Sequence, residues 1–494
     1  MEWALVQERK EGFHLHMLYN ICIDYTAKMQ EAAGSSYGEI IAVFGEKGSF
    51  KAYFREDLIR KVELVCGNAV EKNPALAEGI CANFKKRIKR LLDFNGRLNP
   101  SKLNSTGNAG LASLIREYWK EYDEAYVYGE PFAFAVKDHF ASLAEAGIKE
   151  VLVEKGKSGE FGAVFTLLTA PTEKPFATRE EESLLKVIRL IRKNGMEKQF
   201  LSGKAYGKYA ALFKDHEAEY FWVPFDYGGA VWDASYFTDT ARNLMEQGFD
   251  PDKRLREISE YYGRIGEKQR NMEKTLGLDV KTSSYLNVLR ITGFLMDFKK
   301  ECHTKSHFAY RNLLHEAAKR LDWSMEQAYS STPPEIISAL NGEKISPNPK
   351  MLRVLHSTNG KVEMIAAEKA DTSLKKVGLL GKDRAVATEL KGTCACAGTV
   401  RGKARVILSA SDLPKLKKGE ILVTIMTTPD FVHGMKNAAA IVTNDGGITC
   451  HAAIVAREFN IPCVVGTRIA TSAFKDGDLL EVKASHGIVR KVEK

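Results

Sequence analysis

The stretch AAIVTNDGGITCHAAIVAREFNIPCVVGT, from Ala439 to Thr467, carries the clearest structural pattern in this chain of 494 residues. Its apolar run 440–442 predicts a buried strand, and the polar and glycine residues 444–447 predict a turn. A helix is expected to begin at 449–451, and a second buried strand at 463–465. Short apolar strands that alternate with a helix of small residues indicate a compact α/β domain.

The turn and the start of the helix form a candidate anion site. Because Gly446 and Gly447 lack Cβ atoms, their backbone amides can come close to a ligand. His451 is expected in the first helical turn, where unpaired N–H groups and the positive end of the helix dipole favour an anion. A neutral imidazole is also a competent nucleophile near pH 7. The pattern therefore predicts that His451 can carry a phosphoryl group.

The neighbours of His451 support this interpretation. A lone histidine in a helix is usually a surface or core residue, but here the small side chains of Ala452 and Ala453 leave room for a ligand. Side chains one residue apart on a helix point about 100° away from each other, so Cys450 is expected to tune the site without performing chemistry. The predicted phosphate cradle consists of Gly446, Gly447, Thr449, Cys450 and Arg457, with Arg457 as a source of charge stabilisation.

The segment around His451 resembles the phosphohistidine, or swivelling, domain of phosphoenolpyruvate-utilising enzymes, especially phosphoenolpyruvate synthases. Four further stretches agree in order, so that the resemblance covers 389–494; they lie at 390–406, 421–432, 461–466 and 476–489. The resemblance implies that His451 is the catalytic residue of a phosphotransferase and relays a phosphoryl group from ATP or phosphoenolpyruvate to an acceptor. Mg²⁺ is expected by analogy with phosphoryl transfer in general and not from a ligand motif.

The remaining sequence predicts a multidomain α+β protein, in which a mainly helical N-terminal body precedes the α/β domain. Residues 1–250 are expected to be helical with a small β element, for which the runs 150–154 and 161–168 are the candidates. Residues 251–345 resemble the helical segment that precedes the histidine domain in synthase-like enzymes. Residues 346–388 are expected to form a β-hairpin and a polar linker about which the last domain would swivel.

Local signals predict one hairpin turn and two helix starts. Asn359-Gly360 lies between two apolar runs, which is a strong hairpin signal. Thr178 with Glu181, and Ser324 with Gln327, have the spacing of a capping box and predict two helix starts.

Two parts of the complete synthase-like enzymes are not recognised here. The sequence carries no Walker motif or ATP-grasp signature, and it ends at Lys494, which leaves no room for a phosphoenolpyruvate/pyruvate barrel after His451. The chain is therefore expected to be a short form that works with a separate nucleotide-binding or phosphoenolpyruvate/pyruvate-binding subunit. The alternative is a non-catalytic phosphocarrier or a regulatory docking subunit.

Composition restricts the class of protein. The formal charge of +9 suits an anionic small molecule but is too mild and dispersed to indicate nucleic acid. No apolar run approaches the length of a membrane span, and no secretory leader is visible. Eight scattered cysteines are typical of reduced thiols, so a cytoplasmic location is expected.

Other motifs give weaker signals. A metal site at Cys394 and Cys396, or at Cys302, His303 and His307, would need further ligands. The basic run 85–90 is more typical of a solvated helix face than of nucleic-acid binding. The aromatic segment 217–229 favours core packing over a base-stacking or nucleotide site.

Overall fold

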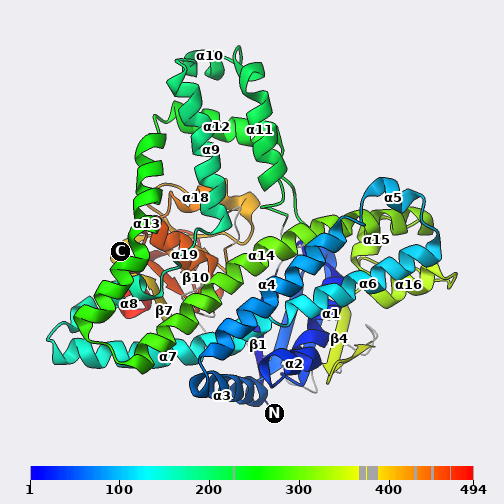
Figure 1. Cartoon of the computed structure of the whole chain (residues 1–494), viewed down its shortest axis with the longest axis horizontal. Helices are drawn as coiled ribbons and strands as arrows, with labels where there is room; N and C mark the ends of the chain where they lie inside the picture. The colour runs from blue at the N-terminus through cyan, green and yellow to red at the C-terminus, as the bar shows by residue number, and fades with distance from the viewer. Residues whose placement is uncertain are drawn as a thin grey trace.

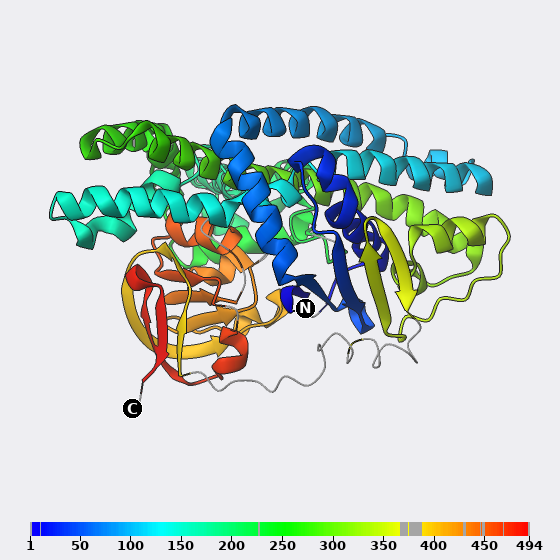
Figure 2. The ribbon, with the colours of Figure 1, turned by 90° about the horizontal axis from the view of Figure 1, so that it is seen from below.

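The fold comprises a helical N-terminal body and a C-terminal α/β domain (Figure 1). The computed structural model describes residues 2–9, 11–225, 228–365, 374, 388–427, 431–444, 446, 450–467 and 469–492. The architecture confirms the predicted multidomain α+β class. In Figure 2 the C-terminal domain, coloured orange to red, lies against the long helices and beside the N-terminal sheet.

The body contains one antiparallel sheet whose strands come from two distant parts of the chain. Its order is β1-β3-β2-β4-β5, and its strands are β1 (Trp3–Arg9), β2 (Glu39–Phe44), β3 (Phe50–Arg55), β4 (Arg353–Thr358) and β5 (Lys361–Ile365). The predicted hairpin is confirmed, since β4 and β5 pair around Asn359 and Gly360, which have φ of 48° and 83°. Because β4 also pairs with β2, this hairpin completes the N-terminal sheet.

Long helices cover this sheet and form most of the body. The longest is α14 (Val280–Leu321), which packs against α4, α6 and α7 and spans about 63 Å at 1.5 Å per residue. Asp279 caps its start by accepting a hydrogen bond from the backbone N–H of Thr282. The helices before α14 are α1 (Leu15–Ile23), α2 (Met29–Ala33), α3 (Glu56–Lys72), α4 (Ala75–Asn95), α5 (Pro100–Asn104), α6 (Asn108–Tyr126), α7 (Glu130–Glu154), α8 (Phe161–Thr169), α9 (Phe176–Lys193), α10 (Glu197–Leu201), α11 (Tyr206–Tyr220), α12 (Ala234–Glu246) and α13 (Pro251–Leu276). Two short helices follow it, α15 (Met325–Tyr329) and α16 (Pro333–Leu340).

The strand prediction for 150–154 and 161–168 is wrong. Both runs are helical, because 150–154 closes α7 and 161–168 lies in α8. In α8 the buried residues Val164, Phe165 and Leu168 follow helical spacing, and the helix packs against α7, α13 and the C-terminal domain. A short apolar helix buried on several sides cannot be distinguished from a buried strand by periodicity alone.

One of the two predicted capping boxes is confirmed. Ser324 and Gln327 cap α15 reciprocally. The prediction for Thr178 and Glu181 is wrong, since α9 begins at Phe176 and both residues lie inside it. Their side chains instead contact the C-terminal domain.

Helices α9 to α12 form a lobe that projects from the body, at the top of Figure 1. Its core includes Tyr220, Trp222 and Val223, which are buried. Over the described part of 217–229 the structure therefore supports core packing.

The C-terminal domain is built on one sheet of order β6-β13-β12-β8-β9-β10-β11-β7. Strands β8 to β11 are parallel to each other, and β9, β10 and β11 are fully buried. The strands are β6 (Glu389–Lys391), β7 (Thr393–Cys396), β8 (Thr399–Val406), β9 (Ile421–Thr424), β10 (Ala440–Thr443), β11 (Cys463–Val465), β12 (Leu479–Lys483) and β13 (Ile488–Lys491). The short helices α18 (Val432–Met435), α19 (His451–Glu458) and α20 (Ala470–Ala473) complete the domain.

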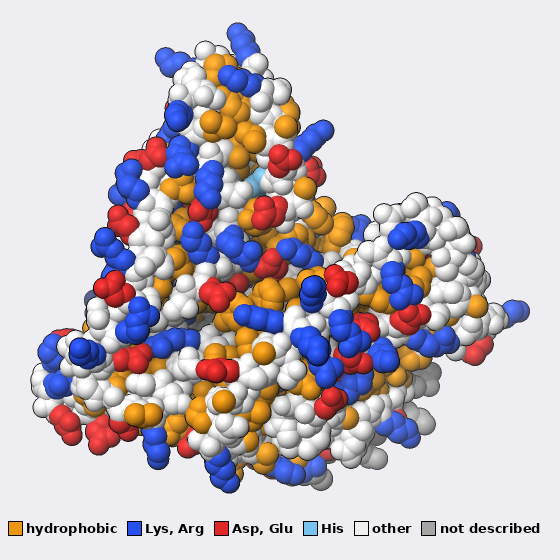
Figure 3. Space-filling view, in the orientation of Figure 1, with side chains coloured by type: hydrophobic (Ala, Val, Ile, Leu, Met, Phe, Trp, Pro, Cys, Tyr) orange, Lys and Arg blue, Asp and Glu red, His pale blue; other side chains and the backbone are white. Residues whose placement is uncertain are grey.

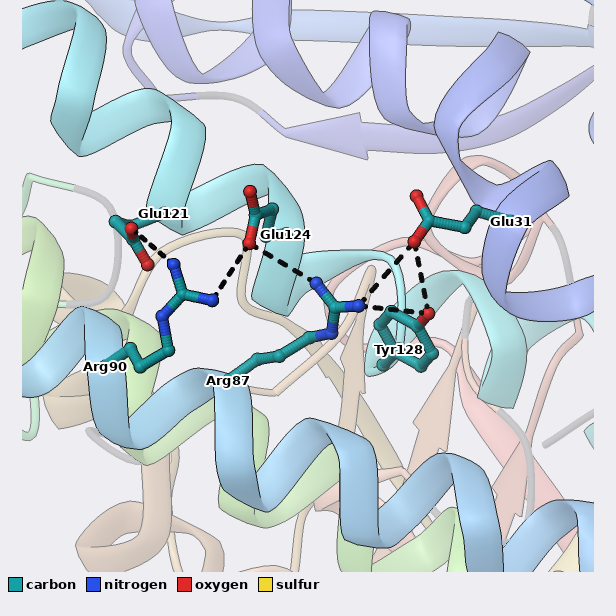
Figure 4. A network of polar contacts seen from close by, with 6 residues as sticks. All are labelled: Glu31, Arg87, Arg90, Glu121, Glu124 and Tyr128. Carbon is teal, nitrogen blue, oxygen red and sulfur yellow. Dashed lines mark hydrogen bonds and ion pairs between the residues drawn. The ribbon is translucent and has the colours of Figure 1, made fainter.

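Charges over the face shown in Figure 3 are mixed, with acidic side chains among the basic ones. The basic run on α4 has acidic partners within the fold (Figure 4). Arg90 pairs with Glu121 at 2.7 Å, and Arg87 pairs with Glu124 at 3.3 Å. The guanidinium of Arg87 also lies over the ring of Tyr128. These contacts show that Arg87 and Arg90 lie on a face of α4 that packs against α6. They weaken the interpretation of the basic run as a nucleic-acid site.

Candidate functional site

The candidate site lies where the buried strand β10 leads into α19. Helix α19 begins at His451, as predicted, and Cys450 occupies its N-cap position in an extended conformation. The first helical hydrogen bond runs from the Ile454 N–H to the Cys450 carbonyl at 3.0 Å. The backbone N–H groups of the first turn have no partner within the helix, and those of Ala452 and Ala453 face the sulfur of Cys450. Gly447, Thr449 and the side chain of His451 lie outside the described part of the structure.

Gly446 fits the turn in a way that another residue could not. Its φ is +104°, and an added Cβ would lie 2.7 Å from the sulfur of Cys450. Gly466, which follows β11, has a φ of +72°, and its Cβ would lie 2.9 Å from the Gly446 carbonyl oxygen. Glycine at both positions lets the turn lie close to α19 and to the end of β11.

Polar contacts that sequence reasoning missed hold the start of this turn. Asn444 donates from Nδ2 to Thr471 Oγ1 at 2.7 Å and accepts from the Thr471 N–H at 2.9 Å. Thr467 donates from Oγ1 to the Thr443 carbonyl at 2.7 Å. Asn444 belongs to a turn signal in the sequence, but no local pattern could have identified its partner in α20.

Arg457 lies on the side of α19 that faces the helical body. It is buried, and its Nη1 lies 3.5 Å from Thr169 Oγ1 of α8. Burial lowers the pKa of its guanidinium, while Tyr261 and nearby thiols oppose that change. Two residues six positions apart on a helix are separated by about 120° around its axis, so Arg457 and His451 lie on different faces of α19. Its role in charge stabilisation stays a prediction.

Cys450 is partly buried, and burial raises the pKa of its thiol. A protonated thiol is a weak nucleophile. The other cysteines of this part of the domain, Cys394, Cys396 and Cys463, also have raised pKa values because of burial. Among the described residues no group of three or more His, Cys, Asp or Glu side chains is placed to hold a metal, including those at Cys394, Cys396, Cys302, His303 and His307.

A Cys450→Ser variant is expected to keep measurable phosphorylation, because the thiol is protonated and serine has a similar size. Intact mass measurement after incubation with a phosphoryl donor checks this. Complete loss of the phosphate from a folded Cys450→Ser protein would require a direct role for the thiol.

A cavity of about 200 Å³ lies between the turn and the helical body. The C-terminal domain contributes Gly446, Cys450 and Ala452, and the segment after β9 contributes Met426 and Thr427. These residues follow the carboxyl ends of parallel strands, which is where open α/β sheets bind ligands. From the body, β1, α7 and α14 supply the charged lining residues Glu8, Arg9, Glu130, Lys137, Asp297, Lys299 and Lys300.

Two of the acids in this cavity have perturbed pKa values. Burial raises the pKa of Asp297 to about 7, although Asp297 accepts a hydrogen bond from the Phe176 N–H at 3.3 Å. Burial would also raise the pKa of Glu130, but the ammonium of Lys299 and hydrogen bonds from Lys299 and Tyr126 hold it below its usual value. Glu130 and Lys299 form a buried ion pair.

The C-terminal domain is held against the body by a set of contacts that we call the docking cluster, formed by Thr178, Glu181, Arg254, Tyr262, Lys436, Glu458 and Phe459. Glu458 accepts hydrogen bonds from the hydroxyl groups of Thr178 and Tyr262. Glu181 pairs with Arg254 at 2.9 Å and with Lys436 at 3.0 Å. Both cations also lie over the ring of Phe459. The cluster fixes the position in which the turn borders the cavity.

Comparison with known proteins identifies the C-terminal domain. Residues 416–487 match the family described as "PEP-utilising enzyme, mobile domain". This part of the chain resembles such a domain, and we call the C-terminal domain the mobile domain. The match includes β10, the turn and all of α19, and it agrees with the resemblance found in the sequence.

Relatives from several organisms match over the same domain. The chain is 55% identical over 100 residues to a "Probable phosphoenolpyruvate synthase" of Archaeoglobus fulgidus. The matched stretch covers 20% of this chain and 13% of that protein. It is 54% identical over 102 residues to a "Phosphoenolpyruvate synthase" of Pyrococcus furiosus. That stretch covers 21% of this chain and 12% of the relative. The chain thus spans about an eighth of the length of these curated relatives.

Among solved structures, a crystal structure of Thermococcus kodakaraensis aconitase X in its holo-form is 23% identical over 22% of this chain and all of that chain. Its TM-score of 0.19 is too low to carry an argument. In the described part of the chain, none of the helices has the length and apolar character needed to cross a bilayer.

Proposed function

We propose that this chain is a phosphotransferase component, similar to phosphoenolpyruvate synthase, in which His451 is transiently phosphorylated. The observation that carries the proposal is the position of His451 at the first residue of α19, after a buried parallel strand, within a mobile domain of PEP-utilising enzymes. A phosphoryl group held there would face the backbone N–H groups of the first turn and the positive end of the helix. Two of the relatives that match over this domain are named as phosphoenolpyruvate synthases.

The proposed relay has two steps. In the first, the unprotonated ring nitrogen of His451 attacks the phosphorus of the donor, the P–O bond breaks, and its electron pair leaves with the donor oxygen. In the second, an oxygen of the acceptor attacks the phosphorus, the N–P bond breaks, and its electron pair returns to the imidazole. The proton of the acceptor hydroxyl passes to a base or to water.

The cradle would consist of Gly446, Gly447, Thr449 and Cys450 with the amides of α19, assisted by Arg457. Mg²⁺ is proposed only as the companion of the phosphoryl donor, where it neutralises charge on the phosphates. Among the described residues, no group of three or more His, Cys, Asp or Glu side chains could hold a metal. No step of the relay is therefore assigned to the metal. A cytoplasmic location also stays a prediction.

The phosphoryl donor is proposed to be ATP or phosphoenolpyruvate, and we expect a second polypeptide to take part. The cavity beside the turn is smaller than the roughly 300–1,000 Å³ that drug-sized ligands occupy, so it does not suit a whole nucleotide. The purified chain alone is therefore expected to form negligible phosphoenolpyruvate from ATP and pyruvate.

A coupled assay for phosphoenolpyruvate tests this expectation, and adding a separate nucleotide-binding or phosphoenolpyruvate/pyruvate-binding subunit should restore activity. Rapid turnover by the isolated chain, lost in His451→Ala, would show that a second subunit is unnecessary. The alternative, a phosphocarrier or docking subunit, predicts that the chain accepts phosphate from a partner enzyme but never exchanges it with a small molecule.

A further inference from the structure

We propose that a cavity inside the helical body binds a free α-amino acid with an apolar side chain. The cavity has a volume of about 500 Å³ and lies between α1, α2, α6 and α16. Its described lining comes only from the body, so the proposal does not depend on phosphoryl transfer by His451. The volume falls within the roughly 300–1,000 Å³ of small-molecule sites.

Two buried carboxyl groups beside this cavity share one cation. Asp123 of α6 lines the cavity, and its side chain is only 7% exposed. Lys28, which also lines the cavity, pairs with Oδ2 of Asp123, and its Nζ lies 3.8 Å from Oδ1 of the fully buried Asp24. Oδ1 of Asp123 and both carboxyl oxygens of Asp24 accept no hydrogen bond from the described residues. Buried polar groups are normally hydrogen-bonded, so these oxygens call for a donor.

The missing donor is best supplied by a ligand ammonium group. Burial raises the pKa of both carboxyl groups, and the charge of Asp123 raises that of Asp24 further, although Lys28 opposes the rise. When both acids are ionised, they have one positive charge between them. An ammonium group in the cavity would add a second charge and donate a hydrogen bond to Asp123. Asp24 and Lys28 are also the ends of a π-helix, η1 (Asp24–Lys28), a rare element that often occurs at functional sites.

Two cations of α6 are placed to receive a carboxylate. Arg116 and Lys120 line the cavity and are exposed, and no acid of the described structure forms an ion pair with either. The other two acids of the described lining, Glu31 and Glu124, are both held by Arg87, at 3.6 Å and 3.3 Å (Figure 4). Arg116 and Lys120 therefore remain available to a negatively charged group of the ligand.

The spacing of these charges fits one small zwitterion. Lys120 and Asp123 are three residues apart on α6, so they are neighbours on one helix face, with about 5–6 Å between Cβ atoms. The ammonium and carboxylate groups of an α-amino acid are attached to the same carbon atom. One such molecule can therefore contact Asp123 through its ammonium group and Lys120 through its carboxylate.

The rest of the lining selects the side chain of the ligand. It is mostly apolar and includes Tyr19, Ile115, Trp119, Pro333, Pro334 and Ile337. An apolar side chain against these walls is removed from water, which favours binding. A charged side chain would instead lose its hydration there.

The test is isothermal titration of the full chain with leucine, methionine, phenylalanine and tryptophan. At least one is expected to bind, and its analogues that lack the carboxylate or the ammonium group should bind at least tenfold more weakly, the scale of one charged hydrogen bond. For phenylalanine these analogues are phenethylamine and 3-phenylpropionate. AMP and ATP are titrated in parallel as nucleotide probes.

Asp123→Asn and Lys120→Gln should each weaken binding of the amino acid about tenfold, because each removes one charged contact. Lys120 is exposed, so its variant should fold even if Asp123→Asn does not. Glu117→Gln and Lys86→Gln are the matched controls. Glu117 lies on α6 outside the cavity lining and pairs with Arg97 at 2.7 Å, and Lys86 is exposed on α4. Melting temperatures establish which variants are folded.

Four results would overturn the proposal. The first is that none of the four amino acids binds, and the second is that the analogues bind as tightly as the amino acid. The third is an unchanged affinity in the folded Lys120→Gln variant. The fourth is binding of AMP or ATP that Lys120→Gln weakens, since the cavity would then be a nucleotide site.

Discussion

Glu181→Ala is expected to weaken the attachment of the mobile domain to the helical body by about 3 kcal/mol, the low end of the cost of breaking a buried ion pair. The substitution leaves Arg254 and Lys436 without the carboxylate that both contact, and Arg254 is largely buried. For a domain of about 100 residues this corresponds to a fall of about 10 °C or more in its melting temperature. Differential scanning calorimetry measures the change.

Glu182→Ala is the matched control for that experiment. Glu182 is the next residue of α9, and it pairs with Lys174 and Lys186 near the surface of the body. Exposed pairs are worth about 0–1 kcal/mol, so the transition of the mobile domain should hardly move. Equal effects of the two variants would mean that the docking cluster does not hold the domain.

Docking of the mobile domain should weaken as the pH falls, because it depends on the charged form of Glu181. Burial would raise the pKa of Glu181, but Lys436 and Arg254 lower it to about 2. A carboxyl whose pKa is lowered in the folded state stabilises that state above its usual pKa. This contribution is present at neutral pH and is lost as the pH falls from about 4.5 toward 2.

His451→Ala is expected to lose all of the acid-labile phosphate that the wild-type chain acquires from its donor. The reason is that His451 alone combines the start of α19, the glycine turn and small neighbours. His486→Ala serves as the control, because His486 is exposed in the same domain. Intact mass spectrometry under alkaline conditions gives the readout. A phosphate that survives in the His451→Ala chain would place the nucleophile elsewhere.

The elements predicted from local patterns agree well with the structure. The strands at 440–442 and 463–465, the start of α19 at His451 and the turn at Asn359-Gly360 each depend on a few neighbouring residues. Hydrophobic alternation, helix-start chemistry and turn propensity act over this range. The strand prediction at 161–168 failed because a helix buried on several sides loses its polar face.

The features that depend on tertiary contacts could not be predicted from the sequence. The pairing of β2 with β4 joins segments about 300 residues apart. The cavity brings together Arg9, Lys137 and Lys300 from three elements, none of which belongs to a motif. Thr178 and Glu181 have the spacing of a capping box, yet their side chains serve the docking cluster. The linker 369–388 that was expected to allow swivelling lies outside the described residues, apart from Leu374 and Thr388.

The most direct test of the central claim is to locate the phosphate on the chain itself. After incubation with ATP or phosphoenolpyruvate, together with any partner subunit that proves necessary, the protein is digested at alkaline pH and its peptides are analysed by mass spectrometry. We expect one phosphate, stable in base and labile in acid, on the peptide that contains both Thr449 and His451. An acid-stable phosphate on Thr449, or a phosphate confined to another peptide, would contradict it.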